Sequence, residues 1–239
     1  MESYWWWPFF QQIKQLDAGF IQTLLGAIVG AAAAIYAQKM SIKAAASEKQ
    51  RATLAEQQSR AFSLLVKIIR IQSNIKPVLD HIDAAVTKQA VEKAELWQTL
   101  LPILNIGDPV HINETEKHTL FELHNDEAFA SVVDLDAIHN SLMEILREYR
   151  DMRNALMQSM KPSGFLGGAA SGEFTRQEWL KIAPRVFEVN SIAEALRDRA
   201  KQDFTSASRA LELVAPLMRE KLGMKIKVMP IKDGADNKR

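Results

Sequence analysis

The chain has 239 residues, and its 30 Lys and Arg residues nearly balance its 29 Asp and Glu residues. This balance gives no general positive field, so we expect no nucleic-acid partner. The chain contains no cysteine, which excludes disulfide bonds, a thiol nucleophile and a cysteine-ligated metal.

Residues 1–17 form an aromatic N-terminal segment with three consecutive tryptophans, Trp5, Trp6 and Trp7. Tryptophan side chains are amphipathic and settle at the headgroup level of a bilayer. We therefore predict that these three residues anchor the chain at a membrane interface.

Residues 18–38 carry no charge, although Asp17 and Lys39 bound them on either side. At about 1.5 Å per helical residue this stretch is roughly 32 Å long, which matches a hydrocarbon core of about 30 Å. We predict one transmembrane helix over 18–38. The two alternatives are a buried Ala-rich helix of a soluble domain and a cleaved signal peptide. The aromatic flank and the long N-terminal region, with its single Lys14, favour a retained span.

The direction of the span follows from its flanking basic residues. Residues 1–17 contain only Lys14, whereas the other flank contains five cations: Lys39, Lys43, Lys49, Arg51 and Arg60. Positive charge stays on the cytoplasmic side. We therefore predict an N-terminus outside, most of the chain in the cytoplasm, and a bacterial inner (plasma) membrane. Lys39 and Lys43 are the predicted anchors on the inner side.

Small residues mark one face of the predicted span. Gly26 and Gly30 form a GxxxG motif, which Ala34 extends by one turn. This spacing lets two membrane helices approach closely, so we predict that Gly26, Gly30 and Ala34 form a helix–helix interface. The chain would then be a homodimer or a higher homo-oligomer.

Residues 39–60 are rich in strong helix formers and contain no Gly or Pro, which predicts a helical stalk. Residues 61–222 then predict a helical bundle domain of about four antiparallel helices. Pro77 interrupts its first apolar seam and should kink the helix or start a new one. A further helical run should continue to about Leu101. The seam residues are Leu64, Ile68, Ile71, Ile75, Val78 and Ile82, widened by Phe62, Leu65 and Ile69.

Capping patterns predict where the later helices begin. Asn113 with Glu116, and Thr175 with Glu178, are spaced as capping boxes, and Asn125 or Asp126 should cap a long helix between them. A 3–4 apolar spacing predicts the inner face of that long helix. Its members are Leu135, Ile138, Leu142, Ile145, Tyr149, Met152 and Leu156. The last helix should bury Ile182, Val186, Val189, Ala193, Leu196, Ala200, Phe204, Leu211, Val214 and Met218.

Two further segments complete the chain. Residues 161–173 contain four glycines and are expected to form a flexible loop. The segment lacks the Gly-Lys-Ser/Thr ending of a phosphate-binding loop, so we do not expect it to bind phosphate. Residues 223–239 form a basic tail that we expect to be flexible.

The histidines are the remaining candidates for metal binding or acid–base chemistry. His111, His118 and His124 cluster with acidic residues, and His139 follows Asp136 at i+3. The chain has no Glu-x-x-His motif of the di-iron type, and His139 falls beside the predicted seam. We therefore expect a solvated polar surface, no catalytic or metal site, and no cofactor.

Taken together, the sequence predicts an all-α, single-pass membrane protein whose bundle binds a protein partner of unknown identity or a second copy of itself. Its other partner is the lipid bilayer. The alternative is a membrane-perturbing effector, such as a defence or toxin component, whose Gly/Ala-rich span oligomerises. A bundle enzyme or a metal protein is the third, least favoured class, because no enzymatic motif is present.

Overall fold

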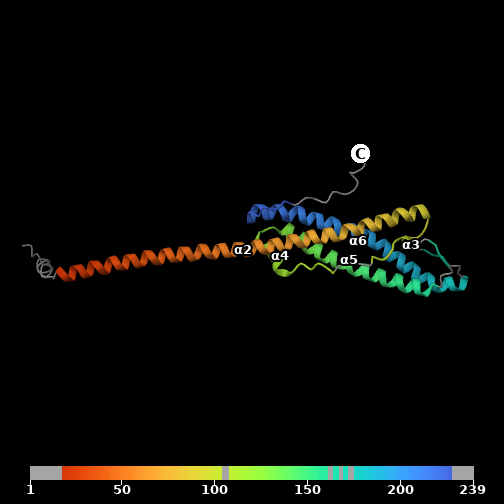
Figure 1. Cartoon of the computed structure of the whole chain (residues 1–239), viewed down its shortest axis with the longest axis horizontal. Helices are drawn as coiled ribbons and strands as arrows, with labels where there is room; N and C mark the ends of the chain where they lie inside the picture. The colour runs from red at the N-terminus through yellow and green to blue at the C-terminus, as the bar shows by residue number, and fades with distance from the viewer. Residues whose placement is uncertain (1–17, 104–107, 161–163, 167–168, 172–174, 228–239) are drawn as a thin grey trace, which may run out of the picture. The chain divides into compact units, whose positions relative to one another are not determined.

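The computed structural model describes residues 18–103, 108–160, 164–166, 169–171 and 175–227. Within these ranges the regular structure is almost entirely helical (Figure 1). The five helices are α2 (Ala18–Glu92), α3 (Leu96–Thr99), α4 (Glu114–Glu122), α5 (Asp126–Ser159) and α6 (Arg176–Leu222). The chain divides into an N-terminal unit, Met1–Ala55, and a helical unit, Glu56–Arg239.

Helix α2 is 75 residues long and continues through Pro77. The expected new helix at this proline does not occur. Proline removes one backbone donor and its ring crowds the preceding turn, but packing on both sides of it outweighs this cost, because Ile75 and Ile82 are fully buried. The predicted helix to Leu101 is also wrong: α2 ends at Glu92, Lys93 takes a positive φ of 52°, and the short α3 follows.

In the helical unit, α6 runs antiparallel to both α2 and α5, so α2 and α5 share one direction instead of alternating as an up-and-down bundle would. Hydrogen bonds join Gln58 of α2 to the Leu222 carbonyl of α6, and Gln72 to Ser208. As the α2 residue number rises, its α6 partner number falls, so these two helices are antiparallel. Between α5 and α6 the same order holds, because Arg209 pairs with Glu127 and His139 pairs with Asp203.

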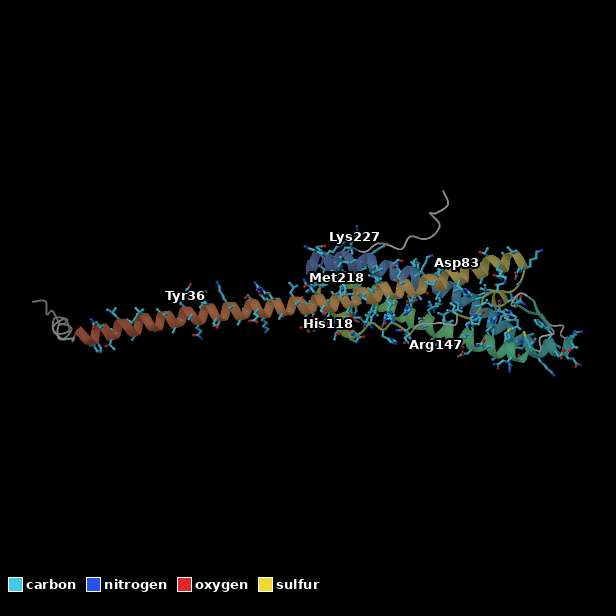
Figure 2. The ribbon with its side chains drawn as sticks, viewed as in Figure 1. Tyr36, Asp83, His118, Arg147, Met218 and Lys227 are labelled. Carbon is cyan, nitrogen blue, oxygen red and sulfur yellow. The ribbon has the colours of Figure 1, made fainter. Side chains whose placement is uncertain are left out.

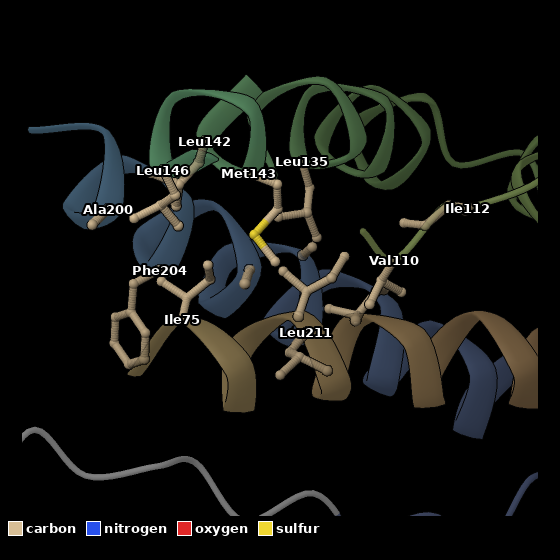
Figure 3. Packing of buried hydrophobic residues seen from close by; sticks show 14 of the residues in the cluster. Ile75, Val110, Ile112, Leu135, Leu142, Met143, Leu146, Ala200, Phe204 and Leu211 are labelled. Carbon is tan, nitrogen blue, oxygen red and sulfur yellow. The ribbon is translucent and has the colours of Figure 1, made fainter. Parts of the chain in front are cut away.

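The core of the helical unit lies between α2, α5 and α6. Figure 3 shows Ile75 of α2, Leu142 and Leu146 of α5, and Phe204 and Leu211 of α6 in one apolar cluster. All ten apolar residues predicted for the inner face of α6 are buried. Each fully buried Leu or Ile side chain contributes about 1.5–3 kcal/mol to folding, so this cluster is the main source of stability.

The predicted N-caps are confirmed. The Asn113 side chain accepts from the Glu116 N–H, and the Glu116 side chain accepts from the Asn113 N–H, which completes the capping box of α4. Thr175 and Glu178 form the same box at α6. Asn125, rather than Asp126, caps α5 through the Ala128 N–H.

The inner face of α5 differs from the predicted one by one residue in part of its length. Leu135, Leu142, Tyr149 and Leu156 are buried, but Ile138, Ile145 and Met152 are only half-buried. The buried residues His139 and Leu146 take the places of Ile138 and Ile145, and the face extends back through Val132 and Ala128. Arg153 is half-buried, as Met152 is. The spacing is still three and four. The predicted face omitted His139 because it is polar, although its side chain lies on the buried face.

Helix α2 shows a second difference. Leu65 is buried as predicted, but Phe62 and Ile69 are exposed by 57% and 37% and do not widen the core stripe. They lie on the other side of α2, because its inner face is already filled by Leu64, Ile68 and Ile71.

Part of the predicted loop at 161–173 has regular structure. Strand β1 (Gly164–Leu166) pairs with β2 (Ala169–Ser171) in an antiparallel hairpin, with Phe165 opposite Ala170. The segment was expected to be a loop without regular structure, and this hairpin is the difference.

Candidate functional site

The uncharged segment of α2 is the most distinctive feature of the N-terminal unit. α2 is the one helix in the described ranges that is long and apolar enough to cross a membrane. The large side chains of this segment are exposed, and Figure 2 shows Tyr36 pointing away from the helix. The large apolar residues of 19–38 that are exposed are Phe20, Leu24, Leu25, Ile28, Val29, Ile35 and Tyr36.

The GxxxG face of this segment is open. A Cβ atom built at Gly19, Gly26 or Gly30 would meet no heavy atom within 4 Å, and Ala34 is exposed. The Thr23 hydroxyl donates to the Gly19 carbonyl at 2.8 Å, so the helix satisfies its own polar side chain. Nothing in the described part of this chain covers the small-residue face.

The predicted interface anchors divide into two groups. Lys39 and Lys43 lie on α2 and are exposed. Trp5, Trp6 and Trp7 lie outside the described residues.

The helical unit contains a buried histidine–aspartate pair. His139 Nδ1 of α5 lies 3.0 Å from Asp203 Oδ2 of α6, and both side chains have an exposed fraction of 0%. His139 was predicted to belong to a solvated surface, and that prediction is wrong. It lies on the inner face of α5, one residue beyond Ile138, where its ring fills core volume and its nitrogen finds a carboxylate.

The pair is only half satisfied by protein groups. His139 Nε2 and Asp203 Oδ1 are both buried without a hydrogen-bond partner in the described structure. Burial raises the pKa of the Asp203 carboxyl above its ordinary value, while the hydrogen bond to His139 acts in the opposite direction. A carboxylate in this position carries a desolvation cost that one hydrogen bond does not fully offset.

A second polar cluster joins α2 to α4. The Glu116 carboxylate accepts from Ser63 Oγ at 2.6 Å and from Lys67 Nζ at 2.7 Å, and its residue is only 3% exposed. Burial alone would raise the pKa of Glu116, but the hydrogen bonds from Lys67, Ser63 and the Asn113 N–H hold it below its ordinary value. Glu116 thus closes its own helix cap and binds a neighbouring helix.

The next residue fixes α4 to α5. Lys117 Nζ lies 2.9 Å from Asp136 and 3.0 Å from Glu114. Burial alone would lower the pKa of Lys117, but these two carboxylates raise it. Asp136 also accepts a hydrogen bond from the Ile112 N–H at 3.1 Å. It therefore binds both α4 and the segment that precedes α4. The sequence paired Asp136 with His139, which instead bonds to Asp203.

Tyr149 fixes the connection after α3. Its hydroxyl donates to the Leu100 carbonyl at 2.6 Å, and Arg153 Nε donates to the Trp97 carbonyl at 3.2 Å. Burial raises the pKa of Tyr149 to about 12, although Arg153 acts to lower it. These bonds satisfy backbone carbonyls that no helix ladder reaches. The apolar periodicity identified Tyr149 as a core residue but gave no sign of this role.

The remaining histidines are not gathered into a metal centre. His118 Nδ1 lies 3.2 Å from Glu122 at an exposed position, and His124 follows the C-cap of α4 with a positive φ of 55°. In the parts of the chain that the structure covers, no three His, Cys, Asp or Glu side chains are placed to hold one metal ion.

No protein-family model, no curated protein and no solved structure matches this chain.

Proposed function

We propose that this protein is a single-pass membrane protein whose cytoplasmic part is an antiparallel helical bundle that serves as an interaction or scaffold module. The span over 18–38 would fix the chain in an inner membrane with its N-terminus outside. The bundle would bind a protein partner or a second copy of the chain.

The exposed apolar segment of α2 carries this proposal. Val29, Ile35 and Tyr36 are 66%, 66% and 68% exposed, and the most apolar 18-residue window of the helix has no buried residue. Apolar surface costs about 25 cal/mol per Å² when it faces water. When this apolar segment enters lipid, its side chains no longer face water and the free-energy cost of their exposure is removed. The helix hydrogen-bonds its own backbone groups there.

The packing of the helical unit supports the bundle part of the proposal. Helix α6 pairs in the opposite direction with both α2 and α5, and the apolar faces of the three helices meet in one core. This core leaves other apolar side chains outside, such as Phe62 at 57% and Phe187 at 73% exposed. Large exposed aromatic residues on an otherwise charged surface are typical of binding surfaces.

Alkaline carbonate extraction of membranes tests the anchor. The full-length protein should stay in the pellet, and a reporter fused after Arg239 should be active in the cytoplasm. A double substitution, Ile28→Arg with Val29→Arg, should release the protein, because each charge at a span centre costs about 2.5–3.5 kcal/mol. Ala45→Arg, at an exposed stalk position, is the matched control and should leave the protein in the pellet.

Release of the unmodified protein by carbonate would overturn the anchor. A reporter active only in the periplasm would reverse the orientation, and the bundle could not then be cytoplasmic.

A further inference from the structure

Complete burial constrains the charge that the His139–Asp203 pair can carry. His139 Nδ1 and Asp203 Oδ2 are 3.0 Å apart, and both side chains are fully closed to solvent. With an ionised carboxylate and a neutral imidazole, the pair would hold one net negative charge. One further proton, on either residue, brings the net charge to zero. The neutral total is favoured at this site, because burial penalises an uncompensated charge.

Hydrogen bonding does not replace that proton. The second carboxyl oxygen, Asp203 Oδ1, is buried without a donor in the described structure, so an ionised Asp203 depends on the single bond to His139. Several donors are needed to keep a buried carboxylate ionised. Burial accordingly raises the pKa of Asp203 above its ordinary value, against the effect of His139.

Charged residues beside the pair on the neighbouring helices have partners of their own. On α5, Asp136 lies one turn before the histidine and 2.9 Å from Lys117 of α4. On α2, Lys76 lies 5.9 Å from the ring centre of Phe204, next to the pair, and forms an ion pair with Asp80 at 2.7 Å. The charges of these residues are therefore balanced outside the buried pair.

Two arginines on α6 are also not bonded to the carboxyl. Arg199 is exposed and donates to Gln202 at 3.1 Å. Arg197 Nε is buried without a hydrogen-bond partner, as Asp203 Oδ1 is, so these two atoms do not bond to each other. His139 is the group whose charge acts on the pKa of Asp203. A proton held by the pair is therefore the charge that can balance the carboxylate.

We propose that His139 and Asp203 hold one titratable proton between them through neutral pH, and that loss of this proton at alkaline pH weakens the contact between α5 and α6. The pair is then a pH-sensitive joint, because its deprotonated form leaves an uncompensated charge between the two helices. The proposal concerns the helical unit alone and is independent of the proposed anchor and of any interaction partner.

Proton linkage gives the direction of the effect. An unfolded histidine loses its proton at about pH 6.5, whereas the folded pair keeps its proton to higher pH. Above that pH the folded state binds more protons than the unfolded state. Stability therefore falls as the pH rises, until the folded pair has also lost its proton. One proton changes the unfolding equilibrium constant by at most about tenfold per pH unit.

Urea unfolding of the full-length protein in detergent, from about pH 7 to about pH 9, tests the joint. The unfolding equilibrium constant of the unmodified protein should rise several-fold over this range. That of Asp203→Asn should stay nearly constant, because no carboxylate remains to be balanced. His118→Gln is the matched control, since His118 contacts Glu122 at an exposed position, and it should keep the slope of the unmodified protein. Equal slopes in the unmodified protein and Asp203→Asn would overturn the proposal, as would loss of the slope in His118→Gln.

Histidine NMR of the unmodified protein gives a second readout that does not depend on the folding of an Asp203 variant. The chain has five histidines, so substituting the other four one at a time assigns the His139 signals by elimination. These signals should shift at a clearly higher pH than those of the exposed His118. If the His139 signals shift at the same pH as those of His118, or at a lower one, the pair does not retain its proton and the proposal is wrong.

Discussion

His139 on α5 and Asp203 on α6 form a hydrogen bond of 3.0 Å at positions fully closed to solvent. The pair is the only histidine–carboxylate contact of the described residues at which both side chains are fully buried. It connects two long helices that pack extensively against each other. Its polar atoms can be satisfied at one helix register only, so the pair fixes how α5 and α6 align.

Removing one partner of this pair should be much worse than removing both. His139→Leu leaves the Asp203 carboxyl buried without its donor, and should lower the free energy of unfolding by about 3–5 kcal/mol. The double variant, His139→Leu with Asp203→Leu, should recover most of that loss, because no orphan polar group remains. Urea unfolding of the full-length protein in detergent, followed by circular dichroism, measures both values. Equal losses in the single and double variants would contradict the asymmetry.

The raised pKa of Asp203 predicts a pH dependence of stability. A carboxyl whose folded pKa lies above its unfolded value of about 3.9 contributes stability below that pH and loses it as the pH rises through the folded pKa. Asp203→Asn cannot titrate. The free energy of unfolding of the unmodified protein, relative to Asp203→Asn, should therefore be highest near pH 4 and should fall toward neutral pH. A constant difference over this range would show that Asp203 keeps an ordinary pKa.

The corrected inner face of α5 predicts a large loss of stability for one substitution and a small loss for another one turn away. Leu142 is fully buried, so Leu142→Ala should cost about 2–5 kcal/mol of unfolding free energy through lost burial and a cavity. Ile138 is only half-buried, and Ile138→Ala should cost about 1 kcal/mol or less. Thermal unfolding of the two variants makes the comparison. Similar losses would restore the sequence-predicted face.

The small-residue face of the span predicts which substitutions weaken self-association in a membrane. Gly30→Ile adds a branched side chain to a face that now has nothing within 4 Å, and should weaken association by around 1 kcal/mol or more. Ile28→Ala, elsewhere on the span, should have little effect. A membrane two-hybrid signal from residues 1–45 measures both. Equal signals from the two variants and the unmodified segment would leave the glycines as ordinary span composition.

The helix caps and the inner face of α6 could be predicted from the sequence, whereas the end of α2 at Glu92 and the buried polar pair could not. Asn113, Asn125 and Thr175 were identifiable as caps because each bonds to a backbone group only three residues away. The inner face of α6 was also predictable, because its apolar residues keep one period throughout. Both features depend on short sequence separations.

The buried pair shows why the rest could not be predicted. His139 and Asp203 are 64 residues apart, and each is acceptable in the core only because the other is there. An apolar pattern search moves past His139 to Ile138, since it scores each residue without its partner. A polar residue at a seam position, three or four places from buried neighbours on each side, was the one signal available.

The bond from Gln58 to the Leu222 carbonyl has a consequence for synthesis. It joins two residues that are 164 positions apart in the sequence, near the first and last residues of the helical unit. At about 5–20 residues per second, the ribosome needs roughly 8–30 s to make the chain between them. During that time the apolar face from Leu64 to Ile82 has no α6 to pack against. The nascent chain therefore exposes the part of this face that α6 covers until α6 has emerged.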